Sequence, residues 1–491
     1  MTYLIPANLD INELLEKFPP RKRKNRKFNT GNLYYLIDLL CSETFDQFEE
    51  GMTDDAFVRL SSTLLNNHIT KYKDSLNYLM DAGVVEANNA YVAGNIATSK
   101  NVARCKGYRF TEPYLREFKE LNIEDSSLNR KKTQARQLSH RKQNEYRHLL
   151  KWFNPKLVID VKAALEFNQM MYEDVRDDKA RWKPKMIQHP WYGLIPSGEV
   201  VDPIYSYQSQ QFAIRRFSEQ EFTFSLSSSR RLYSTLGFLK KEFRQFVSYD
   251  GCRLVELDAG NCQPYLIQGL FNHLFWTNQH DHFNVKDIKQ YHITNNYLKV
   301  LNSSCFSWFK LSTMLGNLAE TVYRQGFQRY QHDVNKGIFY QTFYDNHSSS
   351  PGKDNLYEDE FFDGSTDEKA IASLKYRILK YVNASYRWNS PVKNGFKKDY
   401  PEVHELLMTL KKYDRNNDIS TFMHAIEATI FLFLIAKRFA IEYADRPIYS
   451  IHDCLITTRG HEKILEEIML EEFTKCIGIR PVIKTKYWFS D

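Results

Sequence analysis

The chain has 491 residues, 42% of them hydrophobic and 14% aromatic, which is enough for two to four globular domains and excludes a disordered protein. The net charge is only +7, so the position of the charges matters more than their sum. The seven cysteines form no C-x-x-C pair, which argues against a disulfide framework and a zinc ribbon and favours the cytoplasm. The N-terminus lacks the pattern of a signal peptide. The most apolar run, 428–436, is too short to span a bilayer, so we expect a buried helix and no membrane partner.

A basic arm, residues 1–29, opens the chain. Six of the seven residues between 21 and 27 are basic. This composition is typical both of a solvated, flexible arm and of an arm that binds phosphates. The candidate residues for contacts with a nucleic-acid backbone are Arg21, Lys22, Arg23, Lys24, Arg26 and Lys27.

Residues 30–115 combine helices with a basic hairpin. An amphipathic helix is predicted from residue 71 to its C-cap at Gly83, and "VVEANNAYVAG", 84–94, predicts two strands joined by a turn. The basic segment 100–110 ends in a further strand. This order resembles a winged helix-turn-helix domain, with an ordinary small α+β domain as the alternative. The adjoining basic arm favours nucleic acid as the partner.

A second basic stretch lies in residues 116–190. The run "NRKKTQARQLSHRKQNEYRHLLKW" contains no glycine or proline and is typical of a helix with positive faces. Two interpretations carry equal weight: a thumb-like helical clamp on a duplex backbone, and a solvated helical linker. The candidate backbone contacts are Lys131, Lys132, Arg141 and Lys142.

An acidic residue ends a predicted strand in "RLVELDAGNCQPYLI". Side chains alternate along a strand, so Leu254, Glu256 and Asp258 face one way. Small residues and a helix from about residue 263 follow Asp258. An acid at the end of a strand, beside exposed backbone amides, is typical of metal or phosphate sites, although alone it could simply cap the helix.

A second acid lies in "SIHDCL", residues 450–455, within a predicted β-hairpin. Local sequence favours a tight turn at His452 and Asp453, because aspartate is common in turns. The alternative is that the pair binds a charged ligand. Two carboxylates on separate strand ends suit two-metal phosphoryl transfer, since Mg²⁺ takes one or two carboxylates plus substrate phosphates. We therefore predict that Asp258 and Asp453 are catalytic and hold two Mg²⁺ ions, with Mn²⁺ able to substitute.

These motifs resemble those of the right-hand polymerase superfamily, which holds family A DNA polymerases and phage-type single-subunit RNA polymerases. "LVELDAGNCQP" is similar to the first palm motif, and "SIHDCLITT" is similar to the third, a His-Asp pair in a hairpin. The helix "TFMHAIEATIFLFLIAKRF" carries His424 and Glu427 one turn apart, like the polar pair that faces the primer-template in these families. The resemblance covers roughly residues 225–491.

The resemblance implies an α+β fold of the right-hand polymerase class, with palm, fingers and thumb. Residues 191–491 would form the polymerase region, with an antiparallel palm sheet at about 215–280 and 440–491 and mostly helical fingers at about 281–439. The small winged-helix-like domain would precede it. No acidic cluster typical of a proofreading exonuclease precedes the palm.

The resemblance also implies roles for individual residues. In the fingers helix, 368–390, basic residues would bind the triphosphate and an aromatic would stack on the base. The family spacing is absent there, so Lys375 and Tyr386 compete with the chosen residues for these roles. The nucleotide-binding candidates are Gln263, Arg377, Lys380 and Tyr381, and the primer-template candidates are His424, Glu427, His452, Arg230 and Arg231.

The motifs differ in whether they favour DNA or RNA as the product. "HAIE" and "IHDC" are similar to the RNA polymerase forms, and Cys454 stands where a DNA polymerase would carry an acid. Gln263 is bulky, like the glutamate that crowds a 2′-hydroxyl in family A DNA polymerases. We therefore predict a DNA polymerase that acts on a primer-template with dNTPs, with an RNA polymerase using NTPs as the first alternative. A non-catalytic winged-helix initiator or regulator is the second.

Overall fold

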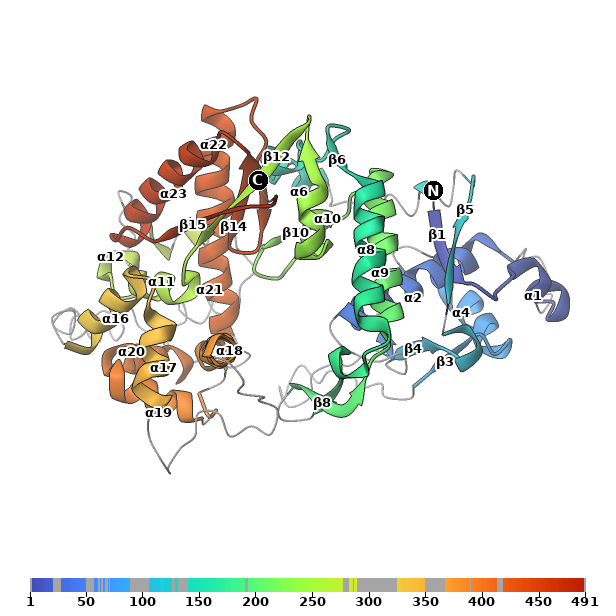
Figure 1. The fold of residues 1–491 in the computed structure, drawn as a ribbon, viewed down its shortest axis with the longest axis horizontal. Helices are drawn as coiled ribbons and strands as arrows, with labels where there is room; N and C mark the ends of the chain where they lie inside the picture. Colours follow the sequence, from blue (N-terminus) through green and yellow to red (C-terminus); the bar gives the residue numbers. More distant parts are fainter. Residues whose placement is uncertain are drawn as a thin grey trace. The chain divides into compact units, whose positions relative to one another are not determined.

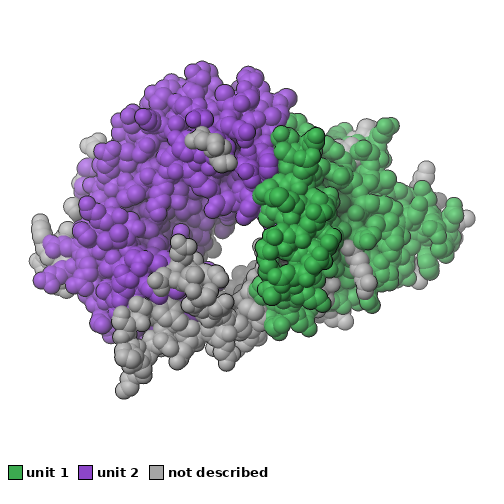
Figure 2. Space-filling view, viewed as in Figure 1, with its two compact units in different colours: residues 1–138, 159–223 green, residues 139–158, 224–491 purple. Residues whose placement is uncertain are grey.

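The computed structural model of the chain mixes helices and strands and divides into two compact units (Figure 1). Unit 1 comprises residues 1–138 and 159–223, and unit 2 comprises residues 139–158 and 224–491 (Figure 2). The finer division into arm, winged-helix-like domain, thumb, palm and fingers stays a prediction. The structure describes residues 2–20, 28–49, 57–60, 62, 65–66, 69, 71–88, 106–115, 117–125, 129–130, 140–189, 193–276, 282–285, 287–288, 325–348, 367–384, 386–388, 390–412 and 418–489.

In unit 1, two helices pack on a three-stranded antiparallel sheet of order β2-β4-β3. Gly83 follows the second helix with φ of +71°, the left-handed conformation that a glycine C-cap adopts, as predicted. β3 pairs with β4, whereas the sequence predicted residues 90–94, which lie outside the described residues, as its partner. The elements are α2 (Gly31–Glu49), β2 (Val58–Arg59), α4 (Tyr72–Asp81), β3 (Val85–Ala87) and β4 (Gly107–Phe110).

The rest of unit 1 extends the same core. Tyr3, Phe45, Phe110 and Phe212 are all buried in one cluster, so the strand pair β1–β5 and helix α9 share a core with the small sheet. Helices α8 and α9 pack on each other, and β7 pairs with β8 in a hairpin. The elements are β1 (Thr2–Pro6), α1 (Ile11–Lys17), the 3₁₀ turn Glu112–Tyr114, β5 (Phe118–Asn122), α8 (Val161–Arg176), the 3₁₀ turn Lys179–Arg181, β7 (Pro184–His189), β8 (Gly193–Val200) and α9 (Pro203–Ser218).

Unit 2 is built around a six-stranded sheet of order β13-β14-β12-β11-β6, with β15 also paired to β12. The predicted strand at 253–258 is β12. It follows β11 through a two-residue turn in which Asp250 and Gly251 both have positive φ, the conformation of a type I′ hairpin turn. The strands are β6 (Leu157–Ile159), β11 (Val247–Tyr249), β12 (Cys252–Ala259), β13 (Tyr449–Ile451), β14 (Cys454–Thr458) and β15 (Ile483–Tyr487).

A smaller hairpin and several short helices flank this sheet. The amphipathic helix that the sequence predicts at 239–247 is instead a 3₁₀ helix, Lys241–Phe246. The predicted basic helix before residue 150 is interrupted at Tyr146. α11 begins at Cys262, as expected from the sequence. The elements are α6 (His140–Glu145), α7 (Arg147–Leu150), β9 (Phe224–Leu226), β10 (Leu232–Ser234), α10 (Thr235–Phe238), η3 (Lys241–Phe246), α11 (Cys262–Gly269) and α12 (His273–Trp276).

A long buried helix runs through unit 2 beside the sheet (Figure 1). It consists of α21 (Asp418–Ala428), a π-helical stretch (Thr429–Ile435) and α22 (Ala436–Glu442). By length and composition, Ile419–Glu442 could cross a membrane, but 78% of its most apolar window is buried within the protein, as in the core helix that the sequence predicts. α23 (Glu462–Ile477) packs against the π-helical stretch and ends at Gly478.

The remaining helices of unit 2 form one cluster. Tyr330, Phe339, Phe396 and Tyr400 are buried in its interior, in contact with one another. Tyr400 also donates a hydrogen bond to the carboxylate of Asp333, at 2.8 Å. The helices are α16 (Gln325–Asn335), α17 (Phe339–Ser348), α18 (Asp367–Asn383), α19 (Pro391–Asp399) and α20 (Pro401–Lys412).

Candidate active site

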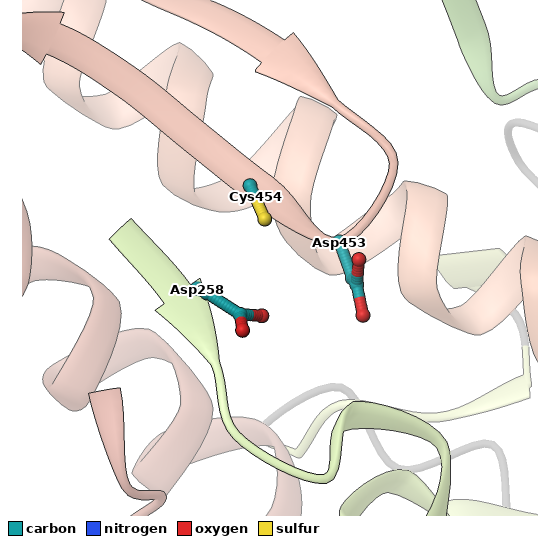
Figure 3. Close-up of side chains that lie close together, drawn as sticks. All are labelled: Asp258, Asp453 and Cys454. Atoms are coloured by element: carbon teal, nitrogen blue, oxygen red, sulfur yellow. The ribbon is translucent and has the colours of Figure 1, made fainter. Parts of the chain in front are cut away.

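The two predicted catalytic carboxylates lie together on the large sheet of unit 2. Asp258 of β12 stands directly opposite Cys454 of β14 in the antiparallel register, and Asp453 is the residue before Cys454. One carboxylate oxygen of each aspartate and the Cys454 sulfur all lie within 4.8 Å of one another (Figure 3). The antiparallel pairing places Asp258 and Cys454 on one face of the sheet. The turn before Cys454 then brings Asp453, 195 positions after Asp258, into the same cluster.

The turn that carries Asp453 has two residues, His452 and Asp453, since Ile451 pairs with Cys454. His452 has φ of +51°, a left-handed conformation that non-glycine residues seldom adopt. The Tyr233 ring of β10 contacts the His452 ring edge-on, with 5.9 Å between the centroids. The tight turn favoured by local sequence is therefore present, and it also presents Asp453 to Asp258.

Burial and nearby charges shift the pKa of Asp258. Burial raises the pKa of Asp258, and the charge of Asp453 raises it further, while Lys375 and Lys484 lower it. Two half-buried carboxylates with oxygens within 4.8 Å of each other repel when both are ionised. A cation between them removes that repulsion.

A buried ion pair links the segment between β9 and β10 to helix α21. Arg231 donates to a carboxylate oxygen of Glu427 at 2.5 Å, and Glu427 is only 1% exposed. Burial raises the pKa of Glu427 to about 7, although Arg231 lowers it. Burial and Arg231 lower the pKa of the half-buried His424 to about 4, so this imidazole is neutral at pH 7.

The neighbouring Arg230 points elsewhere. It has φ of +65° and donates to Glu145 of α6 at 2.5 Å, while its carbonyl accepts from the Tyr146 hydroxyl at 3.0 Å. The two adjacent arginines thus bind carboxylates on different helices. The structure gives both an internal partner, so their predicted contact with a primer-template stays a prediction.

The predicted nucleotide-binding residues differ in their exposure and in the groups that they contact. Gln263 is half-buried and accepts a hydrogen bond from Asn383, at the end of α18, at 3.3 Å. Lys380 lies 5.8 Å from the centre of the Trp388 ring, and Arg377 is partly exposed. Tyr381 is 1% exposed and hydrogen-bonds to His404, at 2.9 Å. Tyr381 is thus packed among the helices of unit 2, and its predicted stacking role stays a prediction.

Two residues that the sequence did not select lie near the carboxylates. Lys375 of α18 is exposed and is the cation that lowers the pKa of Asp258 most. Its ammonium lies 5.8 Å from the centre of the Tyr340 ring of α17. Lys375 was among the competing candidates on α18, because helical spacing could not choose between faces. No pattern in the sequence points to Tyr340.

The predicted backbone-binding residues lie largely outside the described residues. Arg141 and Lys142 are exposed on α6, which leaves them open to a ligand. Those of the arm and the second basic stretch for which the structure gives no placement are Arg21, Lys22, Arg23, Lys24, Arg26, Lys27, Lys131 and Lys132.

The site suits a hard divalent cation, because carboxylate oxygens are the ligands that Mg²⁺ and Mn²⁺ prefer. Asp258 and Asp453 supply two such oxygens within 4.8 Å of each other. Burial raises the pKa of Asp258, and the charge of Asp453 raises it further. The residues present therefore fit a metal ion.

The comparisons with known proteins give matches among solved structures. No protein-family model matches the chain, and no curated protein matches it by sequence. Among solved structures, the chain is similar to the POL domain of Pol1 from M. smegmatis in complex with DNA primer-template and dNTP. The TM-score is 0.40 and the sequence identity 11%, over 74% of this chain and 73% of that one.

Proposed function

We propose that the chain is a template-directed nucleic acid polymerase, most simply a DNA polymerase that adds dNTPs to a primer 3′-hydroxyl and lacks a proofreading exonuclease. The observation that carries the proposal is the convergence of Asp258 and Asp453, from strands far apart in the sequence, beside an exposed lysine on a helix. The sheet of unit 2 would be the palm and the helices α16–α20 the fingers.

The two aspartates would hold the catalytic metal. A divalent ion bound there would neutralise charge on the attacking and leaving oxygens of phosphoryl transfer. Lys375 is placed to pair with the triphosphate, because its charge already acts on Asp258. We therefore assign it the role that the family resemblance implies for Arg377 and Lys380.

The buried ion pair would position the hairpin. Arg231 and Glu427 tie the segment after β9 to α21, next to His424, and Tyr233 holds the ring of His452. These groups would form a rigid support under the primer terminus. His424 would act as a neutral hydrogen-bonding group, since the pKa of about 4 keeps its ring uncharged.

The choice of deoxynucleotides rests on Gln263. Its hydrogen bond with Asn383 holds a bulky side chain between α11 and α18, where it would crowd a 2′-hydroxyl. The alternative is an RNA polymerase. It is favoured by Cys454, which stands where a DNA polymerase would carry an acid.

Unit 1 would bind nucleic acid. The sheet order β2-β4-β3, with α4 directly before β3, is the strand order expected of a winged helix. A non-catalytic winged-helix initiator would use this unit alone and would leave the Asp258–Asp453 pair without a role.

Primer extension separates these functions. The full chain, a labelled primer-template and Mg²⁺ would be incubated with dNTPs or with NTPs, and Asp453→Asn would serve as the matched control. The proposal is supported if wild type extends the primer with dNTPs and Asp453→Asn does not. Extension with NTPs alone would make the chain an RNA polymerase. DNA binding without extension under either condition would favour the initiator.

A further inference from the structure

The third member of the carboxylate cluster is a thiol. Cys454 lies opposite Asp258 in the strand register and is half-buried, with its sulfur within 4.8 Å of both carboxylates (Figure 3). A hard ion such as Mg²⁺ gains little from sulfur, whereas thiolate is a preferred ligand of soft and borderline ions. Two carboxylates and one thiol therefore form a donor set with two different metal preferences.

A third carboxylate lies on the same face of the strand as Asp258. Glu256 is two positions before Asp258 on β12, and its charge acts on the thiol of Cys454. The Glu256 carboxylate also accepts from the Trp488 indole at 2.9 Å and lies 3.5 Å from the Arg244 guanidinium. Glu256 is thus held by other groups and does not depend on Cys454 for its charge balance.

A second feature indicates that the cluster faces a ligand. Tyr340 is only 8% exposed, and its hydroxyl has no hydrogen-bond partner among the residues that the structure describes. Burial raises the pKa of this hydroxyl, and Cys262 and Asp453 raise it further, so the hydroxyl is within electrostatic range of Asp453. The Lys375 ammonium lies 5.8 Å from the centre of the same ring. A tyrosine hydroxyl without a partner among the described residues, in the field of Asp453, is suited to a metal-bound water or anion.

We propose that Asp258, Asp453 and Cys454 form a mixed carboxylate–thiol site that binds thiophilic divalent ions such as Cd²⁺ and Zn²⁺ through sulfur, in competition with Mg²⁺. Binding forms a metal–sulfur bond and releases the thiol proton to solvent. Thiophilic ions bound at this site would displace Mg²⁺ and so inhibit primer extension. This inhibition rests on the proposed polymerase function, whereas the binding of the ions does not.

The test is a Cd²⁺ titration of the metal-free full chain, followed by the ultraviolet charge-transfer band of the cadmium–thiolate bond. The variants are Cys454→Ser, which keeps the volume and removes the sulfur, and Cys252→Ser as a matched control. Cys252 is an exposed free thiol on the same strand as Asp258. Far-UV circular dichroism checks that the variants are folded, and excess Mg²⁺ tests competition for the carboxylates.

We expect Cys252→Ser to keep the high-affinity band and Cys454→Ser to lose it, with Asp453→Asn weakening Cd²⁺ binding by about tenfold or more. Equal bands in wild type and folded Cys454→Ser would overturn the proposal, and so would a band that Asp453→Asn leaves unchanged. Binding does not require turnover, so the two proposals fail separately. A Cys454-dependent band in a chain without extension activity would refute only the polymerase function.

Discussion

Replacing Glu427 by glutamine should change how stability depends on pH. Glu427 is almost fully buried, and its pKa is about 7 instead of the ordinary 4.5. The native state therefore binds a proton on Glu427 more tightly than the unfolded state does. The stabilisation from this proton is complete below pH 4.5 and is lost as the pH rises through 7.

The magnitude follows from the pKa difference. A difference of about 2.5 pKa units corresponds to about 3 kcal/mol, at 1.36 kcal/mol per unit. Glutamine at 427 cannot ionise, so this loss disappears in the variant. Glutamine also weakens the pairing with Arg231, but that cost is constant with pH because arginine stays charged. We expect the free energy of unfolding of Glu427→Gln to gain on wild type by about 3 kcal/mol between pH 4.5 and 8.5.

The assay is urea unfolding of wild type and Glu427→Gln at several pH values, followed by tryptophan fluorescence and far-UV circular dichroism. His424, with a pKa near 4, titrates in both proteins, so its contribution cancels in the difference. Arg231→Met should show the opposite behaviour, since it leaves a buried carboxylate without a counter-ion and so steepens the loss at high pH. Parallel stability curves for wild type and Glu427→Gln would refute this account of the ion pair.

Three further predictions concern catalysis and the helical cluster. Asp258→Asn and Asp453→Asn should each lower primer extension by at least about 10³-fold, with DNA binding by gel shift unchanged. Strong extension by either variant would contradict the metal assignment. Lys375→Ala should raise the KM for nucleotide by about tenfold or more, from loss of a charged contact of about 1.5–3 kcal/mol, while Lys380→Ala serves as the control on the same helix. Tyr381→Phe should lose about 1–2 kcal/mol of stability in urea unfolding, because it removes the hydroxyl that bonds to His404, and it should keep the KM of wild type; a variant as stable as wild type would contradict this.

The sequence predicted the parts of the site that depend on strand periodicity. Asp258 at the end of an alternating strand, and Asp453 in a two-residue turn, are local patterns whose consequences do not depend on distant packing. The strand, the turn and the following helix α11 lie where the sequence places them. Bringing the two acids together needed more than local pattern, and the family resemblance supplied it.

The helical residues near the site were harder to predict. Lys375, Arg377 and Lys380 on α18 differ in which neighbour each faces, and the spacing of charges along one helix cannot decide that. Tyr381 resembles a base-stacking residue in sequence, yet its hydrogen bond to His404 and its burial depend on α20. Tyr340 approaches the site from α17, so no motif on α18 could reveal it.

The turn at His452 and Asp453 is the tight turn that the local sequence favours, and the same turn holds Asp453 close to Asp258. Only a two-residue turn lets Cys454 begin β14 opposite Asp258 while Asp453 stays at the tip, beside both. A longer loop would move Asp453 away from the sheet edge or give it freedom that a metal site cannot use. The turn requires a positive φ at His452, a conformation that costs about 1 kcal/mol or more for a residue with a side chain. Glycine would remove that strain, but it would also remove the ring that packs on Tyr233, so the histidine holds the turn through its side chain.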